Sequence, residues 1–166
     1  MMKCYLYSLV LVAVTTSIPE LVTSISAVRS GALTLADFCV VTSWNARANR
    51  VHSYGEQLPS SESLTHAAIY ELDERICAVV HVHDLDLWQY LKGRVPTTDP
   101  DAAYGTPGMA REFARIWRET DFADAGIAAM AGHDSGIVSI GGNLEQAASR
   151  VLALHDRFYR NEEVAR

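Results

Sequence analysis

The chain has 166 residues, 49% of them hydrophobic and 20% charged, a composition typical of one globular domain that can bury its own core. The net charge of −6 and the lack of any Lys/Arg cluster argue against a nucleic-acid-binding surface. Three widely spaced cysteines have no zinc-type spacing and fit a reducing cytoplasm, and we expect Cys39 and Cys77 to be buried.

The N-terminal segment has two interpretations. An apolar stretch from Tyr5 to Ile18 follows Lys3, and small residues around Ser26 offer a cleavage point, as in a weak signal peptide. The stretch is too short for an ordinary membrane span. We favour a helix or strand of the core, and we expect no membrane partner.

The first half of the chain predicts short strands followed by a helix and a buried strand. A helix begins at Ser60 or Ser61, either of which can cap it, and ends near Leu72. The apolar run 76–83 predicts a strand. The remaining elements are strands at 25–28, 38–43 and 50–53, a helical turn at 34–37 and a tight turn at 45–49.

The second half predicts three more helices and a pair of strands. Helices begin at Asp84 or Asp86, at Thr106-Pro107 and at Asn143, where capping residues precede apolar positions at helical spacing. Strands at 127–131 and 137–140 flank the turn 132–136 and predict an antiparallel pair. Helices mixed with strands throughout favour a layered α/β domain with a mixed sheet.

His81-Val82-His83 is the strongest chemical signal. Side chains alternate across a strand, so we expect Val80 and Val82 to face the core and both histidines to face outward together. Such a pair can hold one metal ion, and catalytic zinc sites usually have three protein ligands. His133, directly after Gly132 in the turn between two strands, is the best third candidate.

Glu62 and the two serines before it form a second candidate group. Free N–H groups at a helix start bind anions, and the hydroxyls of Ser60 and Ser61 add two donors. Glu62 would then transfer protons beside the bound substrate, although a carboxylate that only interacts with the helix dipole is an equally simple interpretation. His66 lies one turn further along the helix, where we favour a half-buried structural residue over a supporting role at the site.

Three other folds that use a histidine pair do not fit. A metallo-β-lactamase-like site needs aspartate where this chain has Leu85, and a cupin-like site needs glutamate where it has Leu87 and Trp88. An amidohydrolase barrel requires roughly 250 residues, and this chain of 166 residues is too short.

The motifs together resemble the class II aldolase/adducin family over residues 24–160. The resemblance rests on Pro59-Ser60-Ser61-Glu62, His81-Val82-His83, Gly132-His133 and the Gly141–Ala147 segment, in the family's order and spacing, with Tyr104-Gly105-Thr106 as a further match. The family's Gly-Asn-x-Ser phosphate loop is not found before residue 24. We therefore divide the chain into a divergent segment, residues 1–23, and a class II aldolase/adducin-like domain, residues 24–166.

The resemblance implies a three-layer α/β/α sandwich with a mixed, largely antiparallel central sheet. It implies Zn²⁺, or Mn²⁺, Co²⁺ or Fe²⁺, on His81, His83 and His133, with Glu62 as the acid/base. Substrate or phosphate binding would fall to Ser60, Ser61 and Gly31. Family members are often homo-tetramers.

These features predict a cytoplasmic, metal-dependent lyase that acts on a small hydroxy-carbonyl compound or sugar phosphate through a metal-stabilised enediolate. An epimerase or dehydratase of the same family is one alternative. A non-catalytic, adducin-like interaction domain is the other, although adducin-type domains lose the metal histidines and this chain keeps all three.

Overall fold

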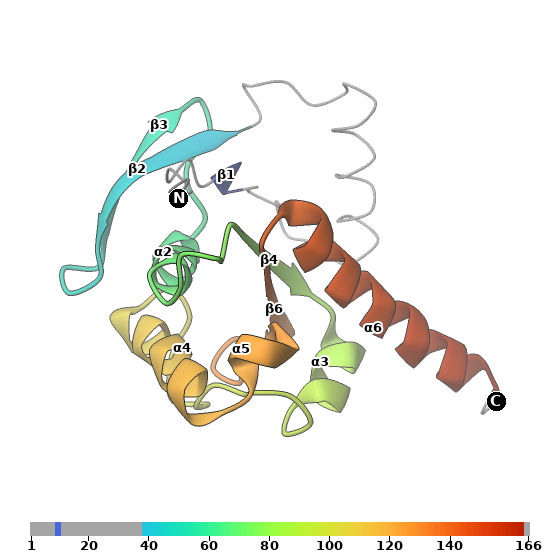
Figure 1. Cartoon of the computed structure of the whole chain (residues 1–166). Helices are drawn as coiled ribbons and strands as arrows, with labels where there is room; N and C mark the ends of the chain where they lie inside the picture. Colours follow the sequence, from blue (N-terminus) through green and yellow to red (C-terminus); the bar gives the residue numbers. More distant parts are fainter. Residues whose placement is uncertain (1–8, 11–37, 165–166) are drawn as a thin grey trace.

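The computed structural model describes residues 9–10 and 38–164 (Figure 1). The strand expected at 25–28, the helical turn at 34–37 and Gly31 lie outside the described residues. The division of the chain at residue 24 therefore stays a prediction.

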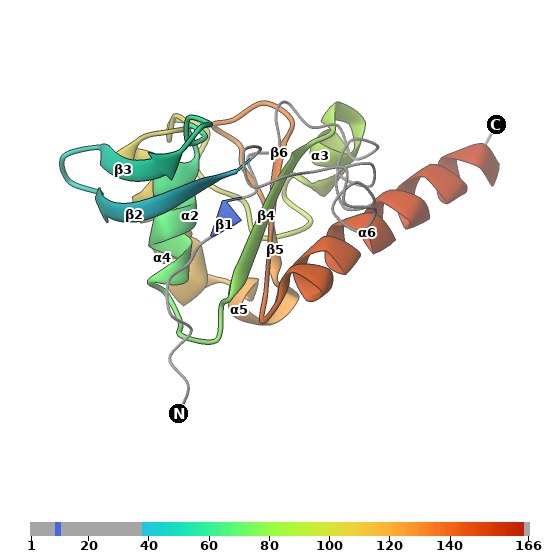
Figure 2. The same cartoon turned by 90° about the horizontal axis from the view of Figure 1, so that it is seen from above.

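The first sheet is antiparallel and has the order β1-β2-β3. Its strands are β1 (Leu9–Val10), β2 (Cys39–Asn45) and β3 (Arg50–Gly55). The β2–β3 hairpin turns at 46–49 and extends from the rest of the described structure on the side opposite α6 (Leu144–Val164) (Figure 2). The two strands predicted here are confirmed, and they form a sheet of their own that the sequence did not separate from the central one.

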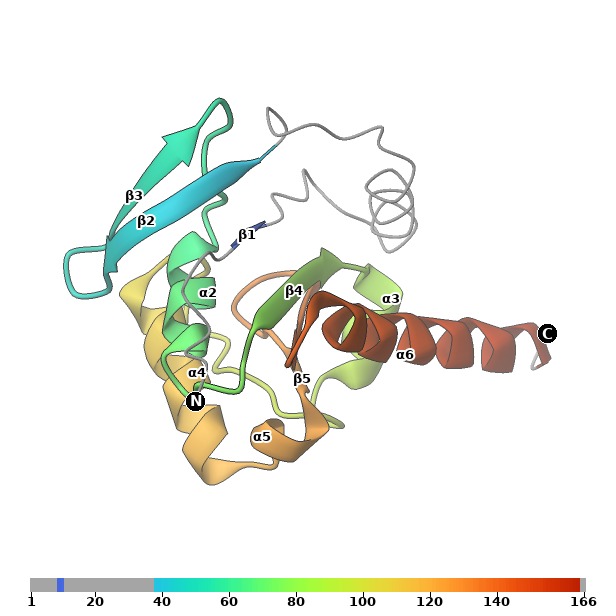
Figure 3. The ribbon, with the colours of Figure 1, turned by 45° about the horizontal axis from the view of Figure 1, so that its top comes forward.

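The second sheet is central and has the order β4-β6-β5, with antiparallel pairing throughout. Helices cover it on both sides (Figure 1, Figure 3). Its strands are β4 (Ala78–His83), β5 (Ile127–Ala129) and β6 (Gly136–Gly141). One helical layer holds α2 (Ser63–Tyr70), α4 (Pro107–Glu119) and α5 (Phe122–Ala125), and the other holds α3 (Leu85–Leu91) and α6.

The alternation of β4 builds two cores, one on each face of the central sheet. Val80 and Val82 pack in one cluster with Leu87 of α3 and Val151 of α6. The second cluster, on the opposite face, contains these residues of the sheet, α2 and α4: Val79, Val138, Ile69, Met109 and Phe113. This arrangement is the predicted α/β/α sandwich. The three strands pair only antiparallel, and the parallel pairing expected of a mixed sheet is limited to an isolated bridge between Thr97 and Ala129.

Local capping rules place three helix starts correctly. The Thr106 hydroxyl accepts from the N–H groups of Gly108 and Met109, with Pro107 in the first turn. The Asp84 carboxylate accepts from Leu87, and Asn143 accepts from Gln146 at the start of α6. None of the described helices has the length and apolar character that a bilayer-crossing segment needs.

Two predictions about burial are wrong. Cys39 is buried as expected, but Cys77, directly before β4, is exposed and disulfide-bonded. This bond gives no support to a reducing compartment. The histidine face of β4 does not face solvent either, because the α2–α4 layer covers that side of the sheet (Figure 3).

Candidate metal and proton-transfer site

Strand β4 brings His81 and His83 side by side, as its period of two dictates. Their ring centroids are 4.7 Å apart, and both residues pair with β6, His81 opposite Val138 and His83 opposite Gly136. Because helix α2 and the turn after β5 cover this face, the His81 Nε2 atom is fully buried, and no described residue forms a hydrogen bond with it.

The turn between β5 and β6 supplies the third imidazole. The backbone N–H of His133 donates to the Met130 carbonyl, and the His133 carbonyl accepts from the Gly136 N–H. These two backbone hydrogen bonds fix the turn. The His133 ring lies 5.1 Å from that of His81 and 4.6 Å from that of His83. The structure thus brings together the three histidines predicted from sequence, and one nitrogen of each lies within 4.8 Å of the others.

Glu62 lies directly beside this cluster at the N-terminal end of α2. Its side chain is only 2% exposed, and Oε1 is 3.9 Å from His133 Nδ1. Neither carboxylate oxygen has a partner in hydrogen-bond geometry among the described residues. Burial therefore raises the pKa of Glu62, and the nearby Thr65 hydroxyl and Gly105 backbone oppose this rise only in part.

Burial also keeps the imidazoles neutral. It lowers the pKa of His133 to about 4 and that of His81 well below the usual range, with the neighbouring histidines adding to the effect at both rings. The pKa of His83 is lowered as well, again mainly by burial. Neutral imidazole is the form that binds metal, so the three rings are available as ligands at neutral pH.

Two further observations fit a metal ion at this cluster. His81 Nε2 and His133 Nδ1 are buried polar atoms without a hydrogen-bond partner in the described part of the chain, which is costly unless something binds them. Gly136 leaves room there, since a Cβ at that position would lie 3.3 Å from His81 Nε2. Three nitrogen donors and one adjacent carboxylate match the ligand chemistry of a catalytic zinc-type site.

The three residues predicted to bind an anion, Ser60, Ser61 and Gly31, do not form one group in the described structure. The Ser60 hydroxyl accepts from Glu62 N–H at 3.2 Å, so it caps the backbone just before α2, which begins at Ser63. Ser61 is exposed, and Gly31 is not described. A phosphate-binding role for these residues stays a prediction.

His66 is more deeply buried than the half-buried residue that we expected. It is buried, with 6% of its surface exposed, and its ring centroid is 6.3 Å from that of His81. Burial lowers the pKa of His66 to about 4. Its position one turn after Glu62 was the only sequence signal, and that signal does not say which face of α2 meets the sheet.

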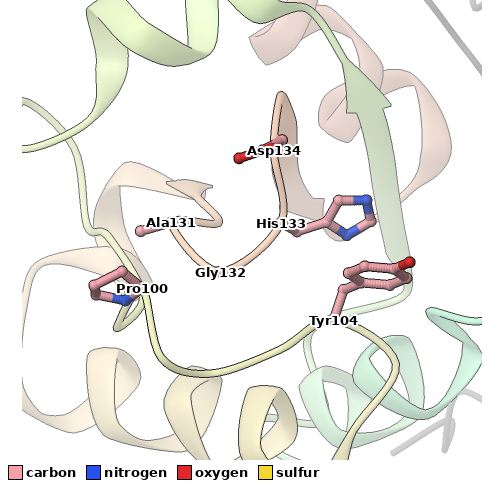
Figure 4. A pocket seen from close by; sticks show the side chains of 6 residues that line it. All are labelled: Pro100, Tyr104, Ala131, Gly132, His133 and Asp134. Atoms are coloured by element: carbon pink, nitrogen blue, oxygen red, sulfur yellow. The ribbon is translucent and has the colours of Figure 1, made fainter.

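Sequence reasoning missed the pocket beside His133. The pocket has a volume of about 420 Å³. The rings of Tyr104 and His133 lie against each other at one side of it, with centroids 4.4 Å apart (Figure 4). Its lining consists of Pro100, Tyr104, Ala131, Gly132, His133 and Asp134. Gly132 lets the β5–β6 turn lie close to the backbone of Ala102, since a Cβ on it would lie 2.0 Å from the Ala102 carbonyl oxygen.

The family comparison agrees with this geometry. The model of the Class II Aldolase and Adducin N-terminal domain matches the part of the chain that holds Glu62, His81 and His83. Residues 14–88 match the class II aldolase and adducin family. The class II aldolase/adducin match ends before His133, so the structure alone brings the third histidine to the other two. No curated protein matches the chain significantly.

Proposed function

We propose that this chain is a metal-dependent lyase of the class II aldolase type that acts on a small hydroxy-carbonyl compound or sugar phosphate. The observation that carries the proposal is the cluster of three neutral imidazoles with a buried, unpartnered carboxylate beside it. No Lys or Arg pairs with Glu62 among the described residues. Its contact with His133, at 3.9 Å, lies within the cluster itself.

His81, His83 and His133 would hold the metal, and zinc suits three nitrogen donors best, with Mn²⁺, Co²⁺ or Fe²⁺ as alternatives. A divalent cation bound there supplies Lewis acidity, which polarises substrate oxygens and stabilises the negative charge that develops on them. Glu62 would hold or release the proton at its carboxylate, where Oε1 is the oxygen nearest His133. Burial raises its pKa toward the range in which a carboxyl can both hold and release a proton.

The pocket beside His133 supports a small substrate. Its lining contains Asp134 and no Lys or Arg, so a phosphate group would not be held there by a cation. If the substrate is phosphorylated, we expect its phosphate at the serines before α2, where Ser61 is exposed at the N-terminal end of the helix.

The decisive experiment compares metal content with turnover in the wild type, Glu62→Gln and the exposed control Glu74→Gln. We expect near-stoichiometric zinc-class metal in all three. Turnover on a panel of ketose phosphates and aldols should be abolished by chelator, and it should fall at least about 100-fold in Glu62→Gln alone.

Wild-type protein without metal would contradict the enzyme proposal and favour a non-catalytic, adducin-like domain. Full turnover in Glu62→Gln would exclude the role of that residue. Interconversion of ketose phosphates without cleavage would favour the epimerase alternative, and loss of water from the substrate the dehydratase.

We also propose that the chain assembles as a homo-oligomer, a tetramer by the family resemblance, which sedimentation of the purified protein would test. Cytoplasmic localisation stays a prediction.

A further inference from the structure

Ser135 has an unusual conformation beside a candidate metal ligand. It lies in the turn between β5 and β6 with φ +63°, and Asn49 is the other described non-glycine residue with a positive φ. Its hydroxyl Oγ is 3.0 Å from His83 Nδ1 and 2.6 Å from the Asp134 carbonyl oxygen. The hydroxyl thus contacts both the His83 ring and a backbone carbonyl.

The direction of these hydrogen bonds follows from counting protons. A serine hydroxyl has one proton, and Ser135 donates it to the Asp134 carbonyl, which can only accept. The contact with His83 therefore requires that Nδ1–H donates to Ser135 Oγ. This contact favours the tautomer with the lone pair on Nε2.

Ser135 is itself held from the adjoining element. Its carbonyl accepts from Asp84 N–H, the residue after His83, at 3.1 Å. The Asp84 side chain caps α3 and accepts from the Tyr159 hydroxyl of α6. The serine backbone is thus fixed to the end of the strand that carries His83, which keeps the hydroxyl within reach of the ring.

We propose that Ser135 is a positioning residue that holds His83 in the Nδ1–H tautomer and leaves Nε2 free to bind the metal. Metal-ligating histidines generally donate their other ring N–H to a fixed acceptor, and loss of that acceptor typically weakens metal binding 10- to 100-fold. The ligand role rests on the proposed function, whereas the tautomer does not depend on any metal.

The chain offers a clean variant and a matched control. Ser135→Gly removes the hydroxyl but keeps the turn, because glycine adopts a positive φ without strain. Asn49→Gly makes the equivalent change at the other left-handed position. Asn49 lies in the β2–β3 turn, far along the chain from the cluster of His81, His83 and His133. Both variants have the same backbone effect, so any difference between them reports on the hydroxyl.

The first measurement is the tautomer of His83 in metal-free protein, read by ¹H–¹⁵N NMR of histidine-labelled samples and assigned by the signals lost in His83→Gln. We expect Nδ1–H in the wild type and Asn49→Gly, and a mixture of tautomers in Ser135→Gly. The second is zinc affinity, by competition with a chromophoric chelator, which should fall roughly 10- to 100-fold in Ser135→Gly alone.

An Nε2–H tautomer in the wild type would overturn the inference. So would an unchanged tautomer and affinity in Ser135→Gly, or an equal loss of affinity in both variants. If wild-type protein binds no zinc while Ser135→Gly still changes the tautomer, the proposed function fails and the link between Ser135 and His83 stands.

Discussion

Gly136 shows how one missing side chain can keep a site open. The residue lies opposite His83 in β6, and a Cβ on it would contact His133 and His81 at 3.1–3.3 Å, tighter than ordinary packing. The histidine cluster therefore depends on glycine here for space and not for backbone freedom.

We predict that Gly136→Ala lowers zinc affinity by about tenfold or more, because the methyl group displaces His81 Nε2 or His133 from the cluster. Competition with a chromophoric chelator measures the affinity, and circular dichroism checks the fold. Gly142→Ala is the control, since a Cβ there meets its nearest atoms at 3.5 and 3.7 Å. Wild-type affinity in Gly136→Ala would show that the cluster does not bind metal in this geometry.

At the scale of elements, helix α4 holds the segment that lines the pocket. The Glu112 carboxylate accepts from Asp99 N–H at 2.7 Å and from the Arg115 guanidinium, which also donates to the Thr97 carbonyl. This α4 clamp fixes residues 97–99, which lead into Pro100 and then Tyr104. The hydrogen bonds from Arg115 and Asp99 hold the pKa of Glu112 below its usual range.

We predict that Glu112→Gln destabilises the protein by about 1 kcal/mol at pH 7, a loss of roughly 2–4 °C in Tm. A carboxyl with a lowered folded-state pKa stabilises the fold above its unfolded pKa near 4.5, and this contribution disappears as pH falls through the folded value. The difference in Tm should therefore shrink below about pH 4.5. Thermal unfolding from pH 7 to pH 3 measures it.

Glu119→Gln is the matched control for this clamp. Glu119 lies on the same helix and pairs with the same arginine at 3.5 Å, but it is 57% exposed, and the hydrogen bond to Asp99 N–H comes from Glu112. We expect a change near zero. A pH-independent loss in Glu112→Gln would contradict the electrostatic explanation.

At the scale of the whole molecule, the site joins distant parts of the chain. Its side chains come from the start of α2, from β4 and from the turn between β5 and β6. A metal ion held by all three histidines would link the central strand to that turn, and it would bind the folded chain and not the unfolded one.

We therefore predict that zinc at about 100 times its Kd raises Tm by roughly 5–10 °C, which corresponds to about 2.7 kcal/mol in a protein of this size. Chelator should reverse the shift. Magnesium, which prefers oxygen ligands, should give none, and neither should zinc added to a His81→Gln/His83→Gln double variant. A similar shift in that variant would place the stabilising zinc elsewhere.

The sequence predicted the elements where the rules are local. Capping at Asp84, Thr106 and Asn143 depends on residues within one helical turn, and the common face of His81 and His83 follows from the period of a strand. Helix α5 was not predicted, because its four residues, Phe122–Ala125, are too few for a helical pattern.

What the sequence alone determined is the set of groups that can do chemistry: two histidines on one strand face, a third after a glycine, and a glutamate at a helix start. Only the tertiary structure decided that Glu62 and His66 are buried, that Tyr104 faces His133, and that Ser135 contacts a histidine 52 residues away. The reason is physical. Burial and contacts between distant residues depend on how sheet and helices pack against one another, and no local pattern in the chain records that packing.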